Sequence, residues 1–188
     1  MIAGIDEAGR GALAGPVVAA CVIFLDQSSK NINYIDSKQT THKQRIQLYN
    51  QLKTSNSIIR WSSINHRIID QTNILKATMK GMSNCIKNLT IKPNKIIIDG
   101  NKKPIFEDLK IETCINGDTL IKEISAASII AKVIRDSIMI KYSHYIPQFN
   151  FKKHKGYGTK EHYNELATHG PCKIHRKTFN LNTQLNLF

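Results

Sequence analysis

The sequence lacks the features that mark a membrane-spanning or secreted protein. Its longest apolar run, residues 17–25, is far shorter than the ~20 residues that span a bilayer. The N-terminus carries Asp6 and Glu7 where a secretory signal would have basic residues followed by an apolar stretch. Cysteines are few and scattered, with no CxxC pair, which argues against a structural zinc site and against disulfides. We therefore expect a cytoplasmic protein with no membrane partner.

Acidic residues are scarce relative to basic ones. The 188 residues include 27 lysines and arginines against 14 aspartates and glutamates, a formal net charge of +13. Such an excess is typical of a protein that binds a polyanion, although a basic surface can also serve solubility alone. Because no basic amphipathic helix of the membrane-surface type is present, nucleic acid is the favoured polyanion.

The pattern of apolar residues predicts one α/β domain. No repeat or Pro/Gly/Ser-rich linker interrupts the chain, so we expect a single, monomeric domain over residues 1–179 and a tail over 180–188. Strands are predicted over 2–5, 17–25, 57–64, 95–99 and 111–115. Helices are predicted over 41–53, 71–89, 123–142 and 159–169. Strands first and βαβ units afterwards favour a mixed sheet with helices packed against it.

The predicted helix over 71–89 has the clearest apolar stripe. Asp70 is its predicted N-cap. The residues expected to face the core are Leu75, Met79, Met82, Ile86 and Leu89.

Three common nucleotide-binding or hydrolytic motifs are missing. The glycine-rich stretch 9–15 reads G-x-G-x-x-x-G, and no acid follows at the spacing that a dinucleotide site requires. The sequence contains neither a G-x-S-x-G elbow nor a G-x-x-x-x-G-K-[ST] loop. A dinucleotide-binding enzyme is therefore disfavoured.

Four acids lie where predicted strands end. Asp6 and Glu7 end the first strand, Asp99 ends another, and Asp118 follows a third. Loops at one edge of a sheet form the ligand crevice, so we expect these side chains to converge. Converging carboxylates repel, and a hard divalent cation such as Mg²⁺ relieves the repulsion. Each acid could instead cap a turn. Together, in a basic protein, they favour metal-assisted phosphoryl chemistry, as in a nuclease with two metal ions ~4 Å apart.

A series of short motifs runs through almost the whole chain. In sequence order they are GIDEAGRG at 4–11, AGPVV at 14–18, DSK at 36–38, IDG at 98–100, GD at 117–118, ISAASIIAKV at 124–133, RD at 135–136, HKGYGT at 154–159, HR at 175–176 and Phe179. In number and order, these motifs resemble the ribonuclease HII family, the type 2 ribonucleases H.

The resemblance implies a fold and an activity. The fold would be RNase H-like, with a mixed five-stranded sheet flanked by helices and a helical C-terminal region. The activity would be Mg²⁺- or Mn²⁺-dependent hydrolysis of the RNA strand of RNA/DNA hybrids. Cleavage at single ribonucleotides embedded in duplex DNA, with 3′-hydroxyl and 5′-phosphate ends, is also implied. By position, the metal-binding catalytic acids would be Asp6, Glu7, Asp99 and Asp118.

Three positions depart from the family's usual pattern. Ala12 stands in place of a proline, Gln39 in place of a second lysine after DSK, and Thr178 in place of a serine. None of these changes removes a predicted metal ligand, and Gln39 is expected to weaken a phosphate contact. The intact acids favour an enzyme over the alternative, a non-catalytic protein that binds RNA/DNA hybrids with the same fold.

The 9–11 loop (Gly9, Arg10 and Gly11) directly follows the acid pair. Glycines let a backbone approach a ligand closely, and backbone N–H and C=O groups can hydrogen-bond a 2′-hydroxyl. The alternative is a tight turn with a solvated arginine. The resemblance favours the nucleic-acid role, and a backbone contact with the sugar predicts little base preference.

Residues 149–179 interleave basic and aromatic side chains, which suits phosphate neutralisation and stacking. Lys155 and Arg176 are predicted to bind nucleic acid, as is Lys38 of the DSK motif. In the family, a tyrosine at the position of Tyr157 stacks near the deoxyribose that follows the ribonucleotide. His154 could touch phosphate or fill a structural role. Asp136 could be a fourth metal ligand, although a salt bridge within its helix is favoured.

The chain ends in QLNLF at 184–188, similar to the QLxLF pentapeptide with which bacterial replication proteins dock onto the sliding clamp. Leu185, Leu187 and Phe188 can enter an apolar pocket while Gln184 hydrogen-bonds its rim. The alternative is a tail that packs on the domain itself. We expect the sliding clamp to be the partner.

Overall fold

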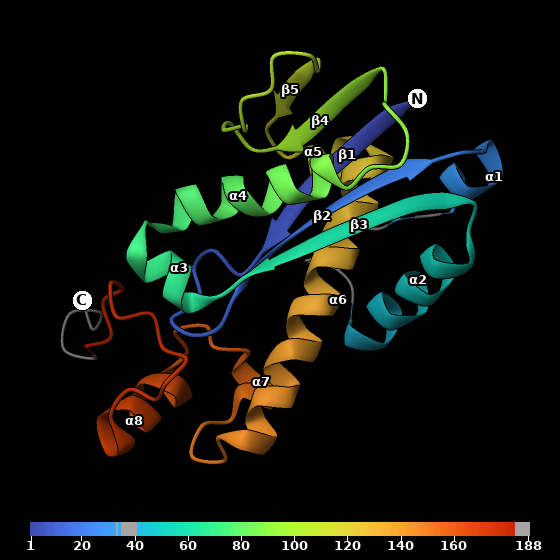
Figure 1. Cartoon of the computed structure of the whole chain (residues 1–188). Coiled ribbons are helices and arrows are strands. Elements are labelled where there is room, and N and C mark those ends of the chain that lie inside the picture. Colours follow the sequence, from blue (N-terminus) through green and yellow to red (C-terminus); the bar gives the residue numbers. More distant parts are fainter. Residues whose placement is uncertain (33, 35–40, 183–188) are drawn as a thin grey trace.

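The centre of the molecule is a five-stranded mixed sheet with the order β3-β2-β1-β4-β5 (Figure 1). The computed structural model describes residues 1–32, 34 and 41–182. The strands are β1 (Ile2–Ala8), β2 (Val17–Phe24), β3 (Ser57–Ile64), β4 (Lys95–Asp99) and β5 (Ile111–Cys114). β1, β2 and β3 are antiparallel neighbours, whereas β4 is parallel to both β1 and β5. The predicted mixed sheet is confirmed.

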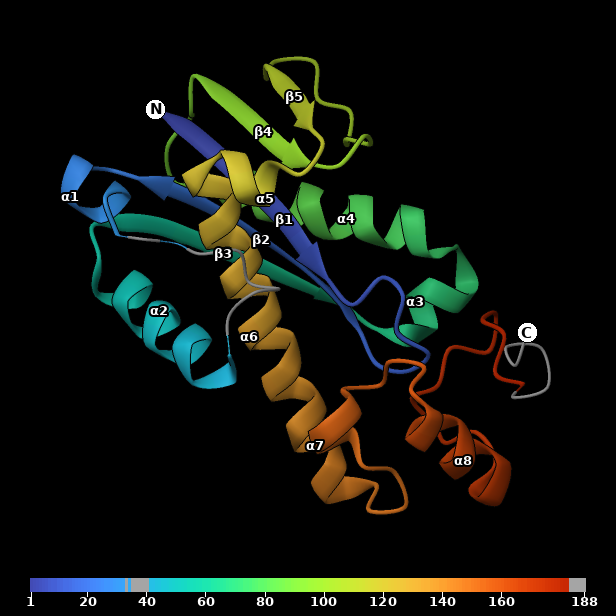
Figure 2. The same cartoon turned by 180° about the vertical axis from the view of Figure 1, so that it is seen from behind.

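Helices cover both faces of this sheet (Figures 1 and 2). α4 (Ile74–Lys87) packs on one face, in a core that includes Met82 and Ile86. α2 (His42–Thr54) and α6 (Lys122–Tyr145) pack on the other, in a core that includes Leu52 and Ile130. α6 lies so close to β1 that a Cβ atom at Gly4 would be 2.2 Å from the carbonyl carbon of Glu123. This close approach brings residues of α6 to the edge where β1 ends.

The C-terminal region forms a separate small core beyond the end of the sheet. It contains α7 (Phe151–His154) and α8 (Lys160–His169), packed near the last turns of α6 (Figure 2). Its buried apolar residues include Leu13, Phe149, Phe151 and Ile174. Because Leu13 belongs to the loop between β1 and β2, this core ties the C-terminal region to the sheet. The predicted helical C-terminal region is confirmed.

The predicted helix over 71–89 corresponds to α4, which is shorter at both ends, and a separate short helix precedes it. α3 (His66–Gln71) ends before Thr72, and α4 begins with Asn73 as its N-cap, whose Oδ1 accepts the N–H of Lys76 at 2.8 Å. The prediction that Asp70 caps this helix is wrong, because its carboxylate accepts N–H groups from the C-terminal segment instead. Leu75, placed in the apolar stripe, is 37% exposed.

Other boundaries differ by a few residues. β1 continues to Ala8, so Asp6 and Glu7 lie inside the strand rather than after it. The sequence pattern did not predict three one-turn helices: α1 (Gln27–Lys30), α5 (Gly117–Leu120) and α7. Over the described part of the chain, none of the helices combines the length and the apolar character needed to cross a bilayer.

Candidate active site

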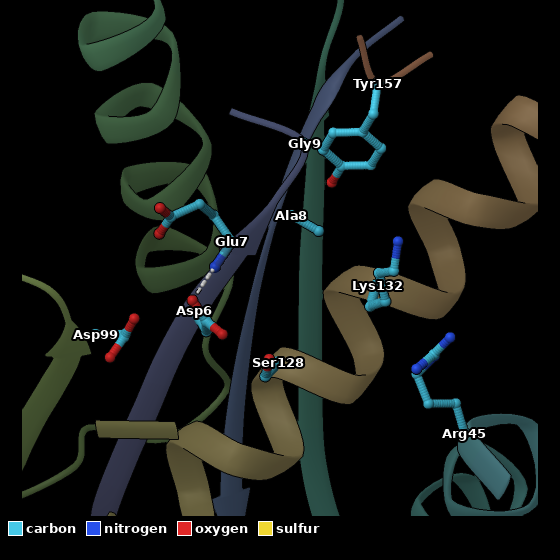
Figure 3. A pocket seen from close by; sticks show the side chains of 9 residues that line it. All are labelled: Asp6, Glu7, Ala8, Gly9, Arg45, Asp99, Ser128, Lys132 and Tyr157. Carbon is cyan, nitrogen blue, oxygen red and sulfur yellow. Dashed lines mark hydrogen bonds between the residues drawn. The ribbon is translucent and has the colours of Figure 1, made fainter. Parts of the chain in front are cut away.

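The parallel pairing of β1 with β4 places two acids side by side. Ile5 is opposite Ile98 in the register, and the next residue of each strand is an acid, Asp6 on β1 and Asp99 on β4. Side chains alternate along a strand, so Asp6 lies on the face covered by α6 while Glu7 points to the other face. Figure 3 shows these three carboxylates at the same edge of the sheet. The sequence prediction of convergence holds for this trio.

Burial and neighbouring charge set the electrostatics of Asp6. Its side chain is 5% exposed, and its Oδ1 accepts the N–H of Glu7 at 2.6 Å. Burial raises the pKa of Asp6 to about 8, and the negative charges of Glu7 and Asp99 add to the increase. Hydrogen bonds with the Ser128 side chain and the Glu7 N–H act in the opposite direction. The site therefore favours a proton or a cation beside Asp6.

Asp118 is held near the end of β4 by a backbone contact. The N–H of Gly117 donates to Asp99 Oδ1 at 2.8 Å, in a turn where Asn116 has a positive φ of 56°. Asp118 follows directly, is buried at 2% exposure, and is not one of the residues lining the pocket that the other three acids share. Within residues 1–32, 34 and 41–182, no three acidic, histidine or cysteine side chains form a ready metal-binding group.

The donors that do line the pocket fit a hard divalent cation. Asp6, Glu7 and Asp99 offer carboxylate oxygens, the ligands that Mg²⁺ and Mn²⁺ prefer. Burial and the charges of Glu7 and Asp99 disfavour an ionised Asp6, and a bound cation would offset both effects.

The opposite wall of the pocket is basic and aromatic. The pocket has a volume of about 460 Å³. Arg45 reaches it from α2, Ser128 and Lys132 from α6, and Tyr157 from the loop before α8 (Figure 3). Lys132 Nζ lies 3.0 Å from Asp136 Oδ1 and 5.2 Å from the centre of the Tyr157 ring. The pocket thus combines an acidic wall with a cationic one.

Asp136 is engaged in the salt bridge that the sequence favoured. The pair spans one turn of α6, and the Asp136 side chain is 5% exposed. Its position against Lys132 gives no support to a role as a fourth metal ligand.

The 9–11 loop lies beside the acids, on a support of buried arginine. Gly9 has φ of 96°, and a Cβ there would lie 1.9 Å from Arg135 Nε, so the protein itself requires this glycine. Gly11 has open space where a Cβ would be. Arg10 is half-exposed and pairs with Glu7 at 3.2 Å. Gly11 therefore remains the position at which a ligand can approach the backbone most closely.

Arg176 was predicted to contact nucleic acid, and that prediction is wrong for its side chain. Arg176 is completely buried. Its guanidinium donates to the carbonyls of Gly9, Arg10 and Gly15 at 2.7, 2.8 and 3.1 Å. Burial, with the charge of Arg135 nearby, lowers the pKa of Arg176 to about 9. These hydrogen bonds hold the 9–11 loop from behind. The burial of the side chain leaves no face of the guanidinium open to a phosphate.

Tyr157 and Lys155 occupy different parts of the same loop. Tyr157 lines the pocket, and the guanidinium carbon of Arg135 lies 4.8 Å from the centre of its ring. Lys155 has a positive φ of 52°, is not among the lining residues, and donates from its ammonium to the Lys152 carbonyl. His154 is buried and bonded to Glu165 at 2.9 Å, which favours the structural alternative over a phosphate contact.

Several predicted residues lie outside the described part of the chain. These are Lys38, Gln39, Gln184, Leu185, Leu187 and Phe188.

Three polar residues of the pocket, Arg45, Ser128 and Lys132, were not predicted as site residues. Ser128 and Lys132 are one helical turn apart, and this polar pair in the mostly apolar ISAASIIAKV segment could have indicated them. Arg45 gave no such signal, because its place depends on how α2 packs against α6.

Comparison with known proteins agrees with this geometry. The family model for ribonuclease HII matches residues 3–182. A ribonuclease HII of Francisella tularensis subsp. mediasiatica is 48% identical over 179 residues, which are 95% of each chain. The ribonuclease H2 of Pyrococcus horikoshii superposes with a TM-score of 0.78 at 25% identity, covering 96% of this chain and 94% of that one. The ribonuclease HII in a PCNA complex from Archaeoglobus fulgidus gives 0.81 at 21% identity, with 98% and 97% covered. The chain therefore belongs to the ribonuclease HII family and is an endonuclease of the ribonuclease H type.

Proposed function

We propose that the acidic pocket hydrolyses an RNA phosphodiester within an RNA/DNA hybrid, and also at a single ribonucleotide embedded in duplex DNA. The products would carry 3′-hydroxyl and 5′-phosphate ends. The observation that carries this proposal is the pairing of Asp6, Glu7 and Asp99 with a basic wall across one pocket. Such a pocket can hold cations against one wall and phosphates against the other.

Metal binding falls to the acidic wall. Asp6, Glu7 and Asp99 would hold Mg²⁺ or Mn²⁺, and Asp118 would join them from its position beside Gly117. When bound, two such ions supply an activated water and neutralise the phosphoryl group, as in other metal-dependent nucleases.

The remaining residues of the pocket bind and orient the substrate. Arg45 and Lys132 are placed to neutralise phosphates next to the cleaved bond. The hydrogen bond with Ser128 keeps the carboxylate of Asp6 in one orientation. Lys38 and Lys155 extend the basic contact to phosphates farther along the duplex. Positioning of this kind is a large part of what a nuclease contributes.

The choice of cleavage site depends on the sugar. Backbone groups of Gly9, Arg10 and Gly11 hydrogen-bond the 2′-hydroxyl, and the Tyr157 ring packs against the deoxyribose that follows it. Two buried arginines support this arrangement from behind, Arg176 under the loop and Arg135 under the ring. Since these contacts read sugar and backbone, cleavage is expected at any base.

The test is a cleavage assay on a duplex with one ribonucleotide. We expect a single cut next to that ribonucleotide, which leaves 3′-hydroxyl and 5′-phosphate ends. The cut should depend on Mg²⁺ or Mn²⁺ and be abolished by a chelator. An all-DNA duplex of the same sequence is the control. Asp99→Asn is expected to bind the duplex without cutting it. Binding by the wild type with no metal-dependent cut would leave only a hybrid-binding protein.

We also propose that the tail at 184–188 docks onto the sliding clamp. The support is its QLNLF sequence, whose apolar residues suit a shallow pocket. Tethering would raise the local concentration of the enzyme where ribonucleotides are incorporated. Titration of the clamp with the intact chain is expected to show binding at about micromolar affinity. Equal binding by a chain lacking 184–188 would refute the proposal without touching the nuclease assignment.

A further inference from the structure

A chain of buried histidines lies behind the pocket, and the proposed chemistry uses none of them. His162 is completely buried, His175 is 2% exposed and His154 is 5% exposed. The rings of His154 and His162 stack at 4.2 Å, and the Nε2 atoms of His162 and His175 lie 2.9 Å apart. Phe149 and Phe151 pack against these rings. Three histidines in one apolar core require an explanation, because each brings polar atoms that must be satisfied.

The neighbours of the His162–His175 pair fix where its protons lie. The N–H of Cys172 donates to His175 Nδ1 at 2.9 Å, so that nitrogen accepts and the proton of the ring is on Nε2. His162 Nδ1 lies 3.0 Å from the carbonyl oxygen of Tyr157, which can only accept, so Nδ1 carries the proton of His162. His162 Nε2 then accepts from His175 Nε2. One arrangement of protons satisfies every nitrogen of the pair, with both rings neutral.

The pair connects the two parts of the substrate-binding surface. Tyr157, whose carbonyl is held by His162, also pairs through its backbone with Ala12. His175 pairs with Ala14 and directly precedes Arg176, whose guanidinium holds the carbonyls of the 9–11 loop. The segment around Ala12 and Ala14 therefore contacts both sides. The hydrogen bond between His162 and His175 completes a closed circuit of contacts. This circuit joins Tyr157 on one side to the 9–11 loop on the other.

Protonation of either histidine would break this circuit at the His162–His175 hydrogen bond. A second proton between the two Nε2 atoms would set two N–H groups against each other. The titratable groups that face the pair from neighbouring segments are Cys172, His154 and His66. Cys172 Sγ lies 3.1 Å from His175 Nδ1, His154 on α7 is itself bonded to Glu165 of α8, and His66 belongs to α3. Burial, together with the facing His154, lowers the pKa of both His162 and His175 to about 4. The His162–His175 hydrogen bond, and with it the circuit of contacts, therefore persists at neutral pH.

We propose that His162 and His175 are positioning residues: their shared hydrogen bond fixes Tyr157 relative to the 9–11 loop, so that both can engage one nucleotide at the pocket. This inference rests on the proposed function of that pocket. It assigns a role to the pair in site selection and orientation, with no contact to the substrate.

A kinetic cycle tests this role. His162→Phe keeps the ring volume but removes both hydrogen bonds, and we expect kcat on a duplex with one ribonucleotide to fall about tenfold or more. KM should change little, because phosphate contacts supply most of the binding. If the pair acts through Tyr157, the double variant with Tyr157→Ala loses no more activity than Tyr157→Ala alone. Additive losses, or unchanged kinetics in His162→Phe, would overturn the proposal.

Two amide variants separate the bonds of His162. His162→Asn retains a donor toward the Tyr157 carbonyl and is expected to recover part of the lost rate. His162→Gln still reaches toward His175 but no longer donates to Tyr157, and it should behave like His162→Phe. It also takes the place of His162→Phe in the cycle should that variant not fold. His169→Phe, an exposed site on the same helix, is the control and should retain the wild-type rate.

A spectrum of the wild-type protein tests the proton arrangement without reference to catalysis. Two-bond ¹⁵N–¹H correlations are expected to show His162 protonated on Nδ1 and His175 on Nε2, with neither ring charged down to about pH 5. The opposite tautomers, or a titration near the ordinary histidine pKa, would overturn the proposal. A wild-type protein with this spectrum that cuts no ribonucleotide duplex would instead contradict the proposed function. The two failures are therefore distinguishable.

Discussion

Two neighbouring polar regions of the molecule are built in opposite ways. At the ends of β1 and β4, Asp6 lies beside two further carboxylates, and its pKa rises to about 8. In the C-terminal region, His162 and His175 satisfy each other, and their pKa values fall to about 4. Burial is the largest cause in both regions. The acids gather like charge that a cation from outside can relieve, whereas the histidines form a bonded network that is already complete.

The difference indicates which region binds and which supports. A site that concentrates repulsion gains most from a ligand of opposite charge, and it costs the free protein stability. A network with every nitrogen satisfied gains nothing from a ligand and loses stability when any member is removed. Substitutions should therefore have opposite effects on stability in the two regions.

The largest expected effect is the loss of activity in Asp6→Asn. Removing this carboxylate takes away a predicted metal ligand, and we expect cleavage to fall by about a thousandfold or more. The free energy of unfolding is expected to rise by about 1 kcal/mol, because burial and the charges of Glu7 and Asp99 make an ionised carboxyl at Asp6 costly in the folded protein. Cleavage rates and urea denaturation measure the two changes. Asp108→Asn, at an exposed position, is the control. A stability loss in Asp6→Asn would contradict this comparison of the two regions.

Acid should act selectively on the C-terminal region. Both His162 and His175 have folded-state pKa values of about 4, below the ordinary 6.5, so the unfolded chain binds more protons between these values. Their contribution to stability is complete above about pH 6.5 and is lost as the pH falls toward 4, by about 2 kcal/mol per histidine between pH 7 and 5. Urea denaturation at several pH values measures the slope. In His162→Phe, the part of the pH dependence of unfolding that comes from the pair should fall to about half. His169→Phe should show the same pH dependence as the wild type.

Replacement of the buried Arg176 should destabilise the protein by removing the hydrogen bonds that hold the 9–11 loop. Arg176→Met would leave the carbonyls of Gly9, Arg10 and Gly15 without their donor, and we expect a loss of about 3 kcal/mol in the free energy of unfolding. Arg67→Met changes an exposed arginine and serves as the control. If Arg176 instead bound phosphate, its replacement would weaken duplex binding and leave stability unchanged.

Sequence patterns predicted the regular parts of the fold and the acidic wall. β3 and β4 have the predicted bounds, since each is a short apolar run whose ends are polar. The place of Asp6 beside Asp99 follows from a simple rule, because parallel strands end at one edge of a sheet.

Tertiary packing decided the rest, as Arg45 and Arg176 show. Arg45 was missed because its approach to the pocket depends on the packing of α2 against α6, residues far apart in sequence. Arg176 was placed on the nucleic-acid surface because a basic motif suggests a phosphate contact. Its guanidinium instead satisfies carbonyls of a loop more than 160 residues earlier, as the bond to Gly9 shows with a separation of 167. Charge in a sequence does not reveal whether the side chain faces solvent.

The smallest effect concerns the tether between α3 and the C-terminal segment. Asp70 accepts the N–H groups of Lys177 and Thr178, both at 3.1 Å, and the hydroxyl of Thr178 at 2.9 Å. These bonds lower the pKa of Asp70, so its contribution to stability is present at neutral pH and is lost as the pH falls through the depressed pKa. We expect Asp70→Ala to cost about 1 kcal/mol.

The matched variant is Asn73→Ala, which removes the actual N-cap of α4 and should cost a similar amount. Hydrogen exchange distinguishes the two. Asp70→Ala should increase exchange at the amides of Lys177 and Thr178 while α4 stays protected, because the tether is lost and the cap is intact. Asn73→Ala should increase exchange in the first turn of α4 and leave the C-terminal segment unchanged. Faster exchange at the start of α4 in Asp70→Ala would restore the capping role that the sequence alone assigned to this residue, and would contradict the tether.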